Sequence, residues 1–576
     1  MDIAQRFEQL KQTLAGTDNH QANNYFSVIR ELLPLKDQNP EFVGSKIAEM
    51  YRQVEDEIKN NDQPPVKPIS FGTSGWRGIL GKEITVKTVA AVTKAIIKLY
   101  VDANTDHELA ALLGVESFSE ARKKGCLVGF DNRFGGEILG KEVARVLSDY
   151  GFTVYYCGES STGVLSAAVL DRGAAFSVNL TPSHNPLEYG GYKYNAADAG
   201  PASGELTSLI TKYARQIVTD RDNQILPLPP RGEKGKIEDI DSLQHWFNIV
   251  QGNKKVHGID YDQLLHTIQK KKDQLDIVID CVHGVSRLHV SRLLKGADEA
   301  LTIIRGESDV SFGGVAPEPS SENIKTVHSY LQKSKKDLKI GAIIDPDADR
   351  IRFTDGITEI SMNQFGAMAY YFMMKEKRKQ GVVAKTVATS NLANAVASAL
   401  GETVFEPKVG FKEFKPVIGK ALVMFEESDG ISIIGHTPEK DAYIGLILAL
   451  DMVLTSGKNL SELKDEIEKQ FGSYWPERDG VLVTVSGEEL LNRLAGLEKY
   501  QVGTELKVGQ EMKTIDKVLS IDGRKMIFSD QSWLMIRPSG TEPKVRFYVE
   551  SREPEGTKDL VDTARAMLKD LKLIEN

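Results

Sequence analysis

The stretch Ala174–Leu180 (AAFSVNL), followed directly by Thr181-Pro182-Ser183-His184-Asn185-Pro186, is the most informative part of this chain. Its first seven residues are mostly apolar and partly β-branched or aromatic, which predicts a short buried strand. Pro182 and Pro186 then prevent a helix or a strand from continuing. We expect a stiff loop at the carboxyl end of a strand, with Ser183 and His184 held at a fixed angle. A proline-rich surface turn is the alternative interpretation of the same residues.

A cation follows this loop closely. Gly190-Gly191-Tyr192-Lys193 carries it, and the two glycines give the backbone a flexible approach. Ser183, His184 and Lys193 therefore form one candidate cluster.

The composition limits the class of protein. The chain has 576 residues, 41% of them hydrophobic and 27% charged, so it predicts an ordinary globular protein of roughly three to five domains. The formal net charge of −9, with no basic tract, argues against nucleic acid as the main partner. The three cysteines have no CxxC spacing, which is typical of a reducing compartment.

Targeting signals are not recognised in the sequence. The first residues lack the basic and apolar regions of a signal peptide. The apolar run 444–454 is interrupted by Asp451 and is too short to span a bilayer. We expect a cytoplasmic protein with no membrane partner.

The rest of the chain repeats the pattern of the first stretch, a short apolar run followed at once by a polar cluster. The six runs and the clusters after them are 126–130 then 131–133, 174–180 then 181–186, 277–279 then 280–284, 340–344 then 345–350, 421–425 then 426–430, and 533–536 then 537–541. Amphipathic helical stretches separate them, and residues 1–62 have helical periodicity throughout. Alternating strands and helices predict α/β layers, whose ligands bind beyond the carboxyl ends of the strands. Several α/β domains should therefore pool their loops in one cleft.

Asp345-Pro346-Asp347-Ala348-Asp349 places three carboxylates at alternate positions. In a tight loop they can converge on one cation, and hard oxygen ligands select Mg²⁺ or Ca²⁺. Arg350 and Gly356 stand where an EF-hand needs glycine and glutamate, which excludes that motif. An acidic turn neutralised by Arg350 is the alternative.

Two further loops are rich in donors for an anion. Residues 537–546 combine Arg537, two hydroxyls, Gly540 and further cations, and such a loop can surround a phosphate. Residues 71–78 (FGTSGWRG) hold three glycines and Arg77, which would serve an anion site or a tight turn.

Together these motifs resemble the α-D-phosphohexomutase superfamily, the phosphoglucomutase and phosphomannomutase enzymes. The resemblance covers residues from about 70 to 550 and keeps the family's order. It rests on G-T-S-G-W-R, T-P-S-H-N-P with a later G-x-K, D-P-D-A-D-R, E-E-S with a later Glu-Lys-Asp, and R-P-S-G-T. It implies a fold of three α/β domains and a smaller C-terminal α+β phosphate-binding domain around a central cleft. The domains implied are a helical extension 1–65, domain I 66–228, domain II 229–357, domain III 358–460 and domain IV 461–576.

The resemblance also implies a role for individual residues. Ser183 would be the phosphoserine, and its phosphate would share Mg²⁺ with Asp345, Asp347 and Asp349. The residues implied around the transferred group are Arg77, His184, Lys193 and Arg350, with either Lys193 or His184 assisting proton transfer. Those implied in substrate binding are Gly410, Lys412, Glu426, Ser428 and Lys440 at the sugar, and Arg537, Ser539, Gly540, Thr541 and Arg546 at the non-reacting phosphate.

The chain departs from the family pattern at a few positions. Pro346 and Ala348 replace glycines that many members have, so we expect negative φ at both. Asp429 stands where glycine is frequent, which leaves the sugar preference open. Val409 replaces a frequent threonine.

The activity implied is a Mg²⁺-dependent phosphoglucomutase that interconverts glucose 1-phosphate and glucose 6-phosphate through glucose 1,6-bisphosphate. Glu427 favours the glucose branches by analogy, and a phosphomannomutase or phosphopentomutase is the alternative. A non-catalytic phosphosugar-binding relative is more remote. The oligomeric state stays open, and residues 1–62 could be an oligomerisation surface or a clasp on the first domain.

Overall fold

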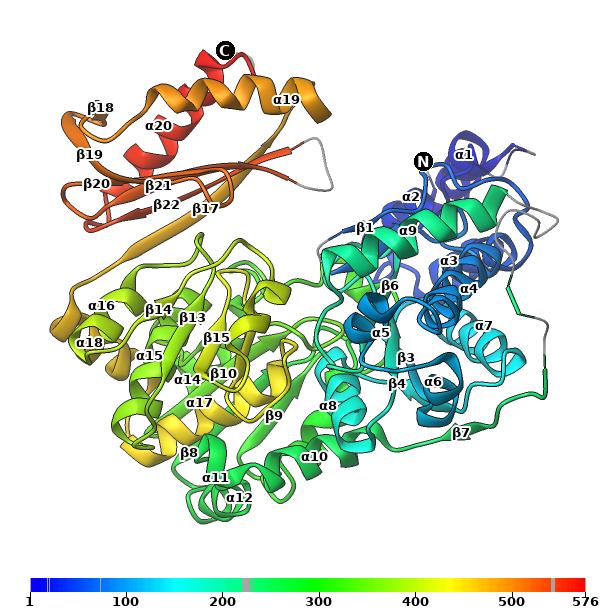
Figure 1. Cartoon of the computed structure of the whole chain (residues 1–576), viewed down its shortest axis with the longest axis horizontal. Coiled ribbons are helices and arrows are strands. Elements are labelled where there is room, and N and C mark those ends of the chain that lie inside the picture. The colour runs from blue at the N-terminus through cyan, green and yellow to red at the C-terminus, as the bar shows by residue number, and fades with distance from the viewer. Residues whose placement is uncertain are drawn as a thin grey trace.

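The computed structural model describes residues 2–17, 19, 21–72, 74–219, 228–229, 232–539 and 544–574. Four β-sheets follow one another along the chain, and helices cover them (Figure 1). Three of the sheets mix parallel and antiparallel strands, and the fourth is antiparallel throughout. The expected architecture of three α/β units and a C-terminal α+β unit is confirmed.

Three helices precede the first sheet, and each has a capping side chain at its start. They are α1 (Ile3–Ala15), α2 (Tyr25–Leu32) and α3 (Pro40–Asn60), with a 3₁₀ turn η1 (Leu33–Leu35) after α2. The carboxylate or amide oxygens of Asp2, Asn24 and Asn39 accept hydrogen bonds from the first turns. The apolar faces of these helices share a single core with the first sheet, so the N-terminal segment is an integral part of the first unit.

The first sheet has the strand order β1-β2-β6-β5-β3-β4-β7. Its strands are β1 (Phe71–Gly72), β2 (Gly75–Ile79), β3 (Cys126–Phe130), β4 (Val154–Glu159), β5 (Phe176–Leu180), β6 (Tyr189–Ala196) and β7 (Ile237–Asp239). Its helices are α4 (Val86–Asp102), α5 (His107–Leu113), α6 (Phe118–Lys124), α7 (Gly136–Asp149), α8 (Thr162–Arg172) and α9 (Gly204–Thr219). Because β3 and β5 are parallel neighbours, the loops that follow them meet at one edge of the sheet.

The second sheet has the order β12-β11-β10-β8-β9. Its elements are α10 (Ser242–Gly252), α11 (Lys254–His257), α12 (Tyr261–Lys270), β8 (Leu275–Asp280), α13 (Ser286–Leu293), β9 (Leu301–Ile304), η2 (Phe312–Gly314), α14 (Lys325–Lys333), β10 (Leu338–Ile344), β11 (Ile351–Thr354) and β12 (Glu359–Ile360). The aspartate-rich loop joins β10 to β11, which are antiparallel neighbours. That loop is therefore a tight reversal rather than a strand.

The third sheet has the order β14-β13-β15-β16. Its elements are α15 (Met362–Lys375), β13 (Val382–Lys385), α16 (Leu392–Ala399), β14 (Val404–Phe405), η3 (Phe411–Val417), β15 (Ala421–Phe425), β16 (Ile431–Ile433), α17 (Ala442–Ser456) and α18 (Leu460–Phe471). The second and third sheets share one apolar core, in which every residue of α17 from Ala442 to Leu454 is buried. These two units therefore pack as one body.

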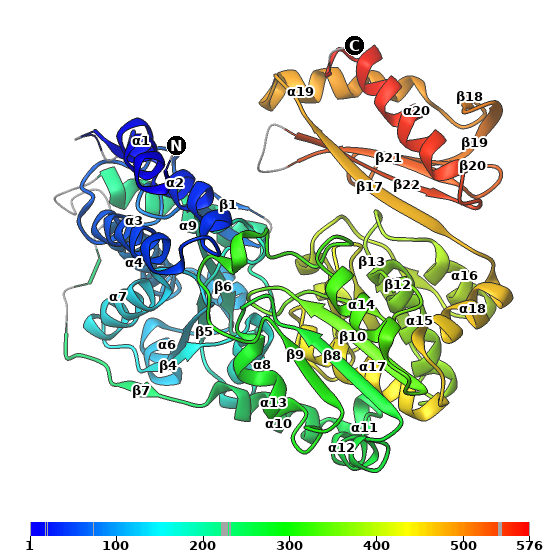
Figure 2. The same cartoon turned by 180° about the vertical axis from the view of Figure 1, so that it is seen from behind.

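The fourth sheet has the order β17-β22-β21-β20-β19-β18. Its elements are β17 (Trp475–Leu482), α19 (Gly487–Leu494), η4 (Ala495–Lys499), β18 (Glu505–Val508), β19 (Glu511–Leu519), β20 (Arg524–Phe528), β21 (Trp533–Pro538), β22 (Lys544–Ser551) and α20 (Gly556–Asp570). Seen from either side, β17 leads away from α18 into this unit, and α19 and α20 cover the face turned away from the third sheet (Figure 2). The unit has its own core.

Each of the six apolar runs singled out in the sequence coincides with a strand, contains one or lies within one, namely β3, β5, β8, β10, β15 and β21. The limits of the units differ from our expectation in two places. β7 pairs with β4, so the first sheet continues past residue 228, and Ile467 of α18 lies in the core shared by the second and third sheets. We therefore propose boundaries after 239 and 471 in place of 228 and 460. The suggested linker 226–232 lies mostly outside the described residues.

No single helix among the described residues combines the length and apolarity needed to cross a membrane. By length and composition alone, α17 and α18 would meet that test only as a pair bent by 79°.

Candidate active site

Ser183 lies at the carboxyl end of β5, as the sequence predicts, and its backbone is held in an unusual conformation. Its φ is +59°, in the left-handed region that non-glycine residues rarely adopt. The Ser183 amide donates to Oγ1 of Thr181 over 2.8 Å, and that hydroxyl donates to Asp131 after β3 over 2.6 Å. Ser183 is buried. The turn therefore fixes the direction of the Ser183 hydroxyl.

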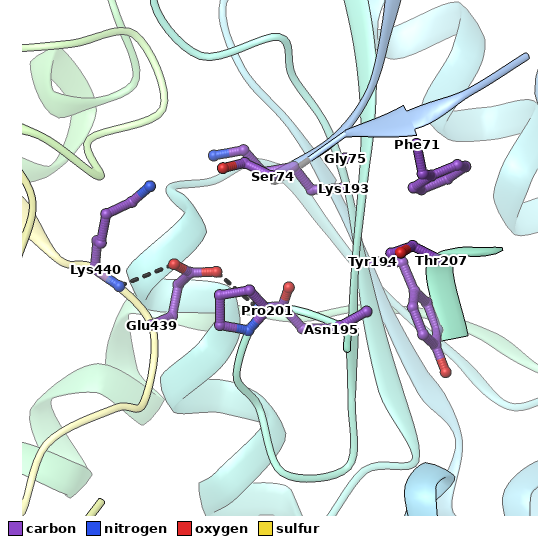
Figure 3. A pocket seen from close by; sticks show the side chains of 11 residues that line it. Phe71, Ser74, Gly75, Lys193, Tyr194, Asn195, Pro201, Thr207, Glu439 and Lys440 are labelled. Carbon is purple, nitrogen blue, oxygen red and sulfur yellow. Dashed lines mark hydrogen bonds between the residues drawn. The ribbon is translucent and has the colours of Figure 1, made fainter. Parts of the chain in front are cut away.

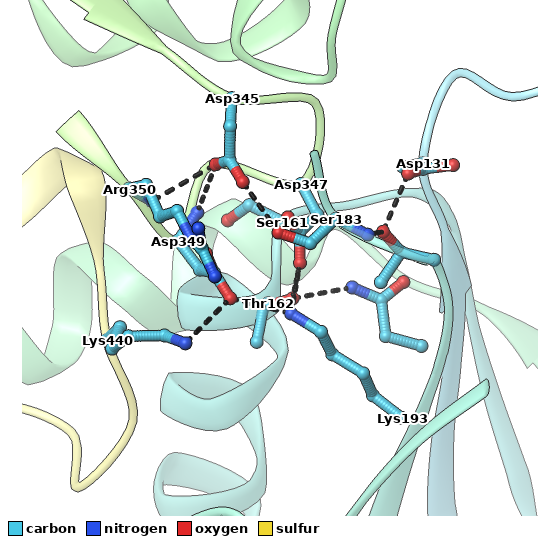
Figure 4. A network of polar contacts seen from close by, with 12 residues as sticks. Asp131, Ser161, Thr162, Ser183, Lys193, Asp345, Asp347, Asp349, Arg350 and Lys440 are labelled. Carbon is cyan, nitrogen blue, oxygen red and sulfur yellow. Dashed lines mark hydrogen bonds and ion pairs between the residues drawn. The ribbon is translucent and has the colours of Figure 1, made fainter. Parts of the chain in front are cut away.

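The Ser183 hydroxyl points to the aspartate-rich loop of the second unit. Its Oγ donates to Oδ2 of Asp345 over 2.7 Å, across 162 residues of sequence (Figure 4). The Asp345 Oδ1 accepts the backbone amides of Asp349 and Arg350, each over 3.0 Å. These bonds close the loop on itself and hold one carboxylate directly against the serine.

The loop converges three carboxylates on one point. Single oxygens of Asp345, Asp347 and Asp349 lie within 4.8 Å of one another, and all three side chains are buried. Oδ1 of Asp347 and Oδ1 of Asp349 are buried without a hydrogen-bond partner among the described residues. Hard, anionic oxygens that remain unsatisfied in a buried site fit Mg²⁺. The Nε of Arg350 lies 3.5 Å from Oδ1 of Asp349, so an acidic turn neutralised by Arg350 alone would compensate that oxygen in part and leave Oδ1 of Asp347 without a partner.

Our expectation of negative φ at Ala348 is wrong. Its φ is +52°, because the loop must reverse between Asp347 and Asp349 to bring both carboxylates inward. The Ala348 amide donates to the Asp345 carbonyl and its own carbonyl accepts from Ala442, each over 3.0 Å. These contacts impose the left-handed turn on an alanine where many family members have glycine.

Lys193 neutralises part of this charge. Its Nζ lies 2.6 Å from Oδ2 of Asp349 and also binds Oδ2 of Asp347. Burial alone would lower the pKa of Lys193, but the two carboxylates raise it above its ordinary value. Lys440 adds a second ammonium 3.3 Å from Asp349. Lys193 is therefore a charged ammonium in this state of the site.

The carboxylates of the loop differ in pKa. Burial, together with the charges of Asp347 and Asp349, raises the pKa of Asp345 well above its ordinary value. Burial would also raise the pKa of Asp349, but Lys193, Lys440 and Arg350 hold it well below. Asp345 therefore holds a proton more tightly than an ordinary aspartate does, because the surrounding cations do not offset the charges of the other two carboxylates at that position.

Arg77 and His184 stand beside the same cluster. Arg77 lies on β2 opposite Gly191 of β6, and burial, with the charge of Arg350, lowers its pKa to about 10. Burial and the charges of Arg350 and Arg77 hold the pKa of His184 well below its ordinary value. The His184 Nδ1 is 3.4 Å from the Ser183 Oγ. A neutral imidazole next to the serine can accept a proton from it.

Several residues of the site escaped the sequence analysis. Thr162, at the start of α8, donates its amide to the Asp347 carbonyl over 3.0 Å and its hydroxyl to the Asp347 carboxylate over 2.5 Å. The Asn179 amide donates to the Thr162 hydroxyl over 3.0 Å. The polar run 159–162 after β4 was the available signal, since β4 is parallel to β3. Arg133, in the cluster after β3, binds the serine loop from behind.

The loop after β15 lies against the aspartate loop. The backbones of Arg350 and Gly430 form a bridge, and the Glu426 carboxylate lies near enough to Asp349 and Arg350 for their charges to act on it. Burial raises the pKa of Glu426 to about 7, against the attraction of Lys440. Glu426 is buried and Ser428 half-buried.

Asp429 has a left-handed backbone, the conformation that favours glycine. Its φ is +71°, and its carboxylate is held by Arg352, with Nη2 to Oδ2 at 2.7 Å. The charge of Asp429 is therefore neutralised beneath the loop.

Two arginines of the fourth unit lie next to each other, and one of them is linked to a loop of the third unit. Arg537 on β21 lies opposite Arg546 on β22, and its Nε is 3.1 Å from Oδ2 of Asp522. The same carboxylate accepts the Val409 amide over 3.0 Å, next to Gly410 and Lys412. The Ser539 amide donates to Lys544, while Gly540 and Thr541 lie outside the described residues. Arg537 and the loop 409–412 are thus joined through one aspartate.

A small cavity of about 20 Å³ lies on the flank of Lys193 (Figure 3). Phe71, Gly75, Asn195 and Glu439 are among the residues that line it, and Asn195 donates to Glu439 over 3.2 Å. This volume holds about one water molecule. The cavity is therefore too small for an organic ligand such as a sugar.

Four family models match the chain in order. They are "Phosphoglucomutase/phosphomannomutase, alpha/beta/alpha domain I" at residues 68–221, domain II at 259–356, domain III at 361–471 and the C-terminal domain at 493–567. Together they cover well over half of the chain.

Relatives match over most of their length. A phosphoglucosamine/phosphogalactosamine mutase from Sulfurisphaera tokodaii is 26% identical, over 86% of this chain and 98% of its own. A phosphoglucomutase/phosphomannomutase from Thermococcus kodakarensis is 24% identical, over 87% and 98%. The open form of the phosphoglucomutase pp63/parafusin from Paramecium superposes with a TM-score of 0.66 at 20% identity, over 89% of this chain and 96% of that one. This last likeness shows the fold alone.

Proposed function

The chain belongs to the phosphoglucomutase/phosphomannomutase family, and on that premise we propose that it is a phosphoglucomutase. It would move a phosphoryl group between the 1- and 6-hydroxyls of glucose through a phosphoserine at Ser183. The observation that carries the proposal is the contact of the Ser183 hydroxyl with Asp345, at a point where three buried carboxylates converge.

The metal in this proposal is Mg²⁺, held by Asp345, Asp347, Asp349 and a phosphate oxygen on Ser183. When bound, it would neutralise charge on the transferred phosphoryl group.

The protein's own cations would hold the transferred group. Arg77, Arg350 and Lys193 lie near the aspartate-rich loop that contacts Ser183, and they can stabilise negative charge as it spreads over the phosphoryl oxygens. His184, neutral by its surroundings, and Lys193 are the candidates for moving the proton of the attacking hydroxyl. Each half of the reaction breaks one P–O bond and forms another, so glucose 1,6-bisphosphate is the intermediate.

The second anchor of the substrate would be the C-terminal unit. Arg537 and Arg546 lie side by side on β21 and β22, and with Ser539, Gly540 and Thr541 they would bind the phosphate that does not react. Glu426, Ser428 and Lys440 would bind sugar hydroxyls, and Gly410 and Lys412 would line the edge of the site. The substrate would then span the loops of all four units.

A phosphoglucosamine mutase is the second candidate, because the name of the Sulfurisphaera relative points to amino sugars. Glu427 supports glucose only by analogy. In the structure its carboxylate accepts hydrogen bonds from Thr386 and Thr389 over 2.8 and 3.2 Å. Phosphomannomutase and phosphopentomutase activities remain part of the test.

The test compares the turnover of glucose 1-phosphate, glucosamine 1-phosphate, mannose 1-phosphate and ribose 1-phosphate with Mg²⁺ and the matching bisphosphate. We expect the highest kcat/KM with glucose 1-phosphate. Ser183→Ala should lower kcat by at least a thousandfold, while Ser456→Ala, a serine outside the site, keeps it. Higher turnover of another sugar would refute the choice of glucose, and an active Ser183→Ala variant would refute the phosphoserine.

A further inference from the structure

Arg133 donates hydrogen bonds to main-chain carbonyl oxygens of the serine loop. Its side chain is 3% exposed. Nη2 donates to the Ser183 carbonyl over 2.6 Å and also to the Asn185 carbonyl, and Nη1 donates to the Pro186 carbonyl over 2.7 Å. One guanidinium thus satisfies three carbonyl oxygens within four residues. The guanidinium of arginine allows this because its donors are spread over a rigid planar group, whereas the donors of a lysine ammonium all lie on one nitrogen.

The segment that carries Arg133 is itself held by the second unit. The Phe312 ring of η2 lies 4.8 Å from the Arg133 guanidinium carbon. The neighbouring Asn132 donates to the His283 carbonyl over 2.5 Å and accepts from Ser308 over 2.9 Å. Arg133 and its neighbour Asn132 are therefore also held by contacts with the second unit.

The N-terminal helices contact the segment that carries Arg133, the end of the serine loop, and η2. Tyr51 of α3 packs on Phe134, next to Arg133, with ring centroids 4.6 Å apart. Arg30 of α2 forms an ion pair with Glu188, at the end of the serine loop. Leu33 of η1 lies beside Gly314 of η2, two residues after Phe312.

We propose that Arg133 is the positioning residue of the phosphoserine loop, and that residues 25–58 form a brace behind it. The inference rests on the proposed role of Ser183. The left-handed backbone of Ser183 is strained and persists only where the surroundings over-determine it. Arg133 supplies that constraint through the three carbonyls, and the brace keeps the segments around Arg133 and the end of the loop in place.

The first experiment compares Arg133→Lys and Arg133→Ala with the wild type by steady-state kinetics and by hydrogen exchange of peptides covering residues 181–189. For Arg133→Lys we expect kcat to fall at least tenfold, KM to change less than twofold, and exchange of this segment to rise at least tenfold. Arg133→Ala should enlarge both effects. Unchanged kcat and exchange in a folded Arg133→Lys variant would overturn the positioning role.

The second experiment tests the brace with substitutions on the protein surface, which should not impair folding. Arg30→Gln removes the ion pair with Glu188. Arg6→Gln is the matched control, because Arg6 pairs with Glu31 inside the extension and the arginine side chains of both pairs are 44% exposed. We expect a two- to fivefold loss of kcat and faster exchange at 184–190 for Arg30→Gln only. Equal behaviour of the two variants would overturn the brace.

Hydrogen exchange separates this inference from the proposed function. A wild type that turns over none of the sugar phosphates would refute the mutase. The exchange of residues 181–189 in the Arg133 variants would still decide whether the guanidinium holds the loop.

Discussion

Three of the eleven non-glycine residues that have a left-handed backbone in the described part of the chain lie in loops of the site. Ser183, Ala348 and Asp429 have φ of +59°, +52° and +71°, and each stands in a different loop of the same cluster. Such strain persists where packing and hydrogen bonds leave the residue no alternative. The side chain of Ala348 is also fully buried, so this position constrains both the backbone conformation and the size of the residue.

Substitutions at Ala348 should separate these two constraints. We expect Ala348→Gly to keep the free energy of unfolding within about 1 kcal/mol, because relief of strain offsets the added freedom of the unfolded chain. Ala348→Val should lower the free energy of unfolding by about 2 kcal/mol or more. A β-branched side chain disfavours the left-handed backbone, and the buried site has no room for its extra volume. Denaturant unfolding would measure both. A valine variant as stable as the wild type would contradict the left-handed turn.

Asp345 should set both the stability of the metal-free protein and its response to Mg²⁺. Its carboxylate is buried beside two others, so Asp345→Asn should raise the melting temperature in a chelator. Mg²⁺ should raise the melting temperature of the wild type by several degrees and that of the variant far less. Asp479→Asn, in an exposed ion pair with Arg565, is the control. A full Mg²⁺ response in Asp345→Asn would contradict the metal site.

At the scale of elements, strands β20 and β21 carry a buried polar network to the third sheet. Lys525 of β20 lies 3.9 Å above the Trp533 ring and donates to the Val387 carbonyl over 2.8 Å. Glu406 lies 3.4 Å from Lys525 and 3.1 Å from Lys385. Burial, with the charge of Lys385, lowers the pKa of Lys525 to about 7. The contact between the third and fourth units thus contains a lysine that titrates near neutral pH.

This lysine should make stability depend on pH. The unfolded chain binds the Lys525 proton up to about pH 10.4, whereas the folded chain releases it near pH 7. Between these values the unfolded state holds more protons, so this contribution to the free energy of unfolding rises with pH, and it is least favourable below pH 7. Lys525→Met should remove that rise. Denaturant unfolding at several pH values would show it, and an identical pH dependence in the variant would contradict the assignment.

The sequence predicts elements better than it predicts contacts between them. The six strands found from apolar runs are mostly buried, and their composition differs sharply from the polar loops that follow. β1, β12 and β14 have two residues each and leave no periodicity. Arg133 binds main-chain oxygens 50 residues away, and Thr162 binds Asp347 across 185 residues, so neither contact has a local pattern. The φ of Ala348 depends on the same long-range contacts.

At the scale of the whole molecule, an acidic protein gathers cations at one site. The net charge is −9, yet Arg77, Arg350, Lys193 and Lys440 surround the serine and the carboxylates. Arg537 and Arg546 add to them from the fourth unit. An anionic substrate is attracted to such a site although the protein as a whole repels it.

Salt should therefore weaken the capture of substrate. We expect kcat/KM to fall several-fold between about 0.02 M and about 0.3 M monovalent salt, with kcat nearly constant, because screening acts on the approach and not on the bound state. Arg537→Gln should lower kcat/KM and flatten this dependence. Measurements in chloride and acetate salts would separate screening from competition by one anion. A salt-independent kcat/KM would contradict electrostatic attraction.

The two ends of the proposed substrate would be held by different units of the fold. Ser183 and its carboxylates belong to the first and second units, and the Arg537–Arg546 pair belongs to the fourth, which meets the third through the apolar cluster around Trp533, Met535 and Tyr548. In the proposed mutase the distance between these two anchors would be set by that remote contact, as in a caliper. A sugar would be selected by the separation of its two ends as well as by its hydroxyls, and repacking the cluster at Trp533 should shift the accepted length of substrate without altering any residue that touches it.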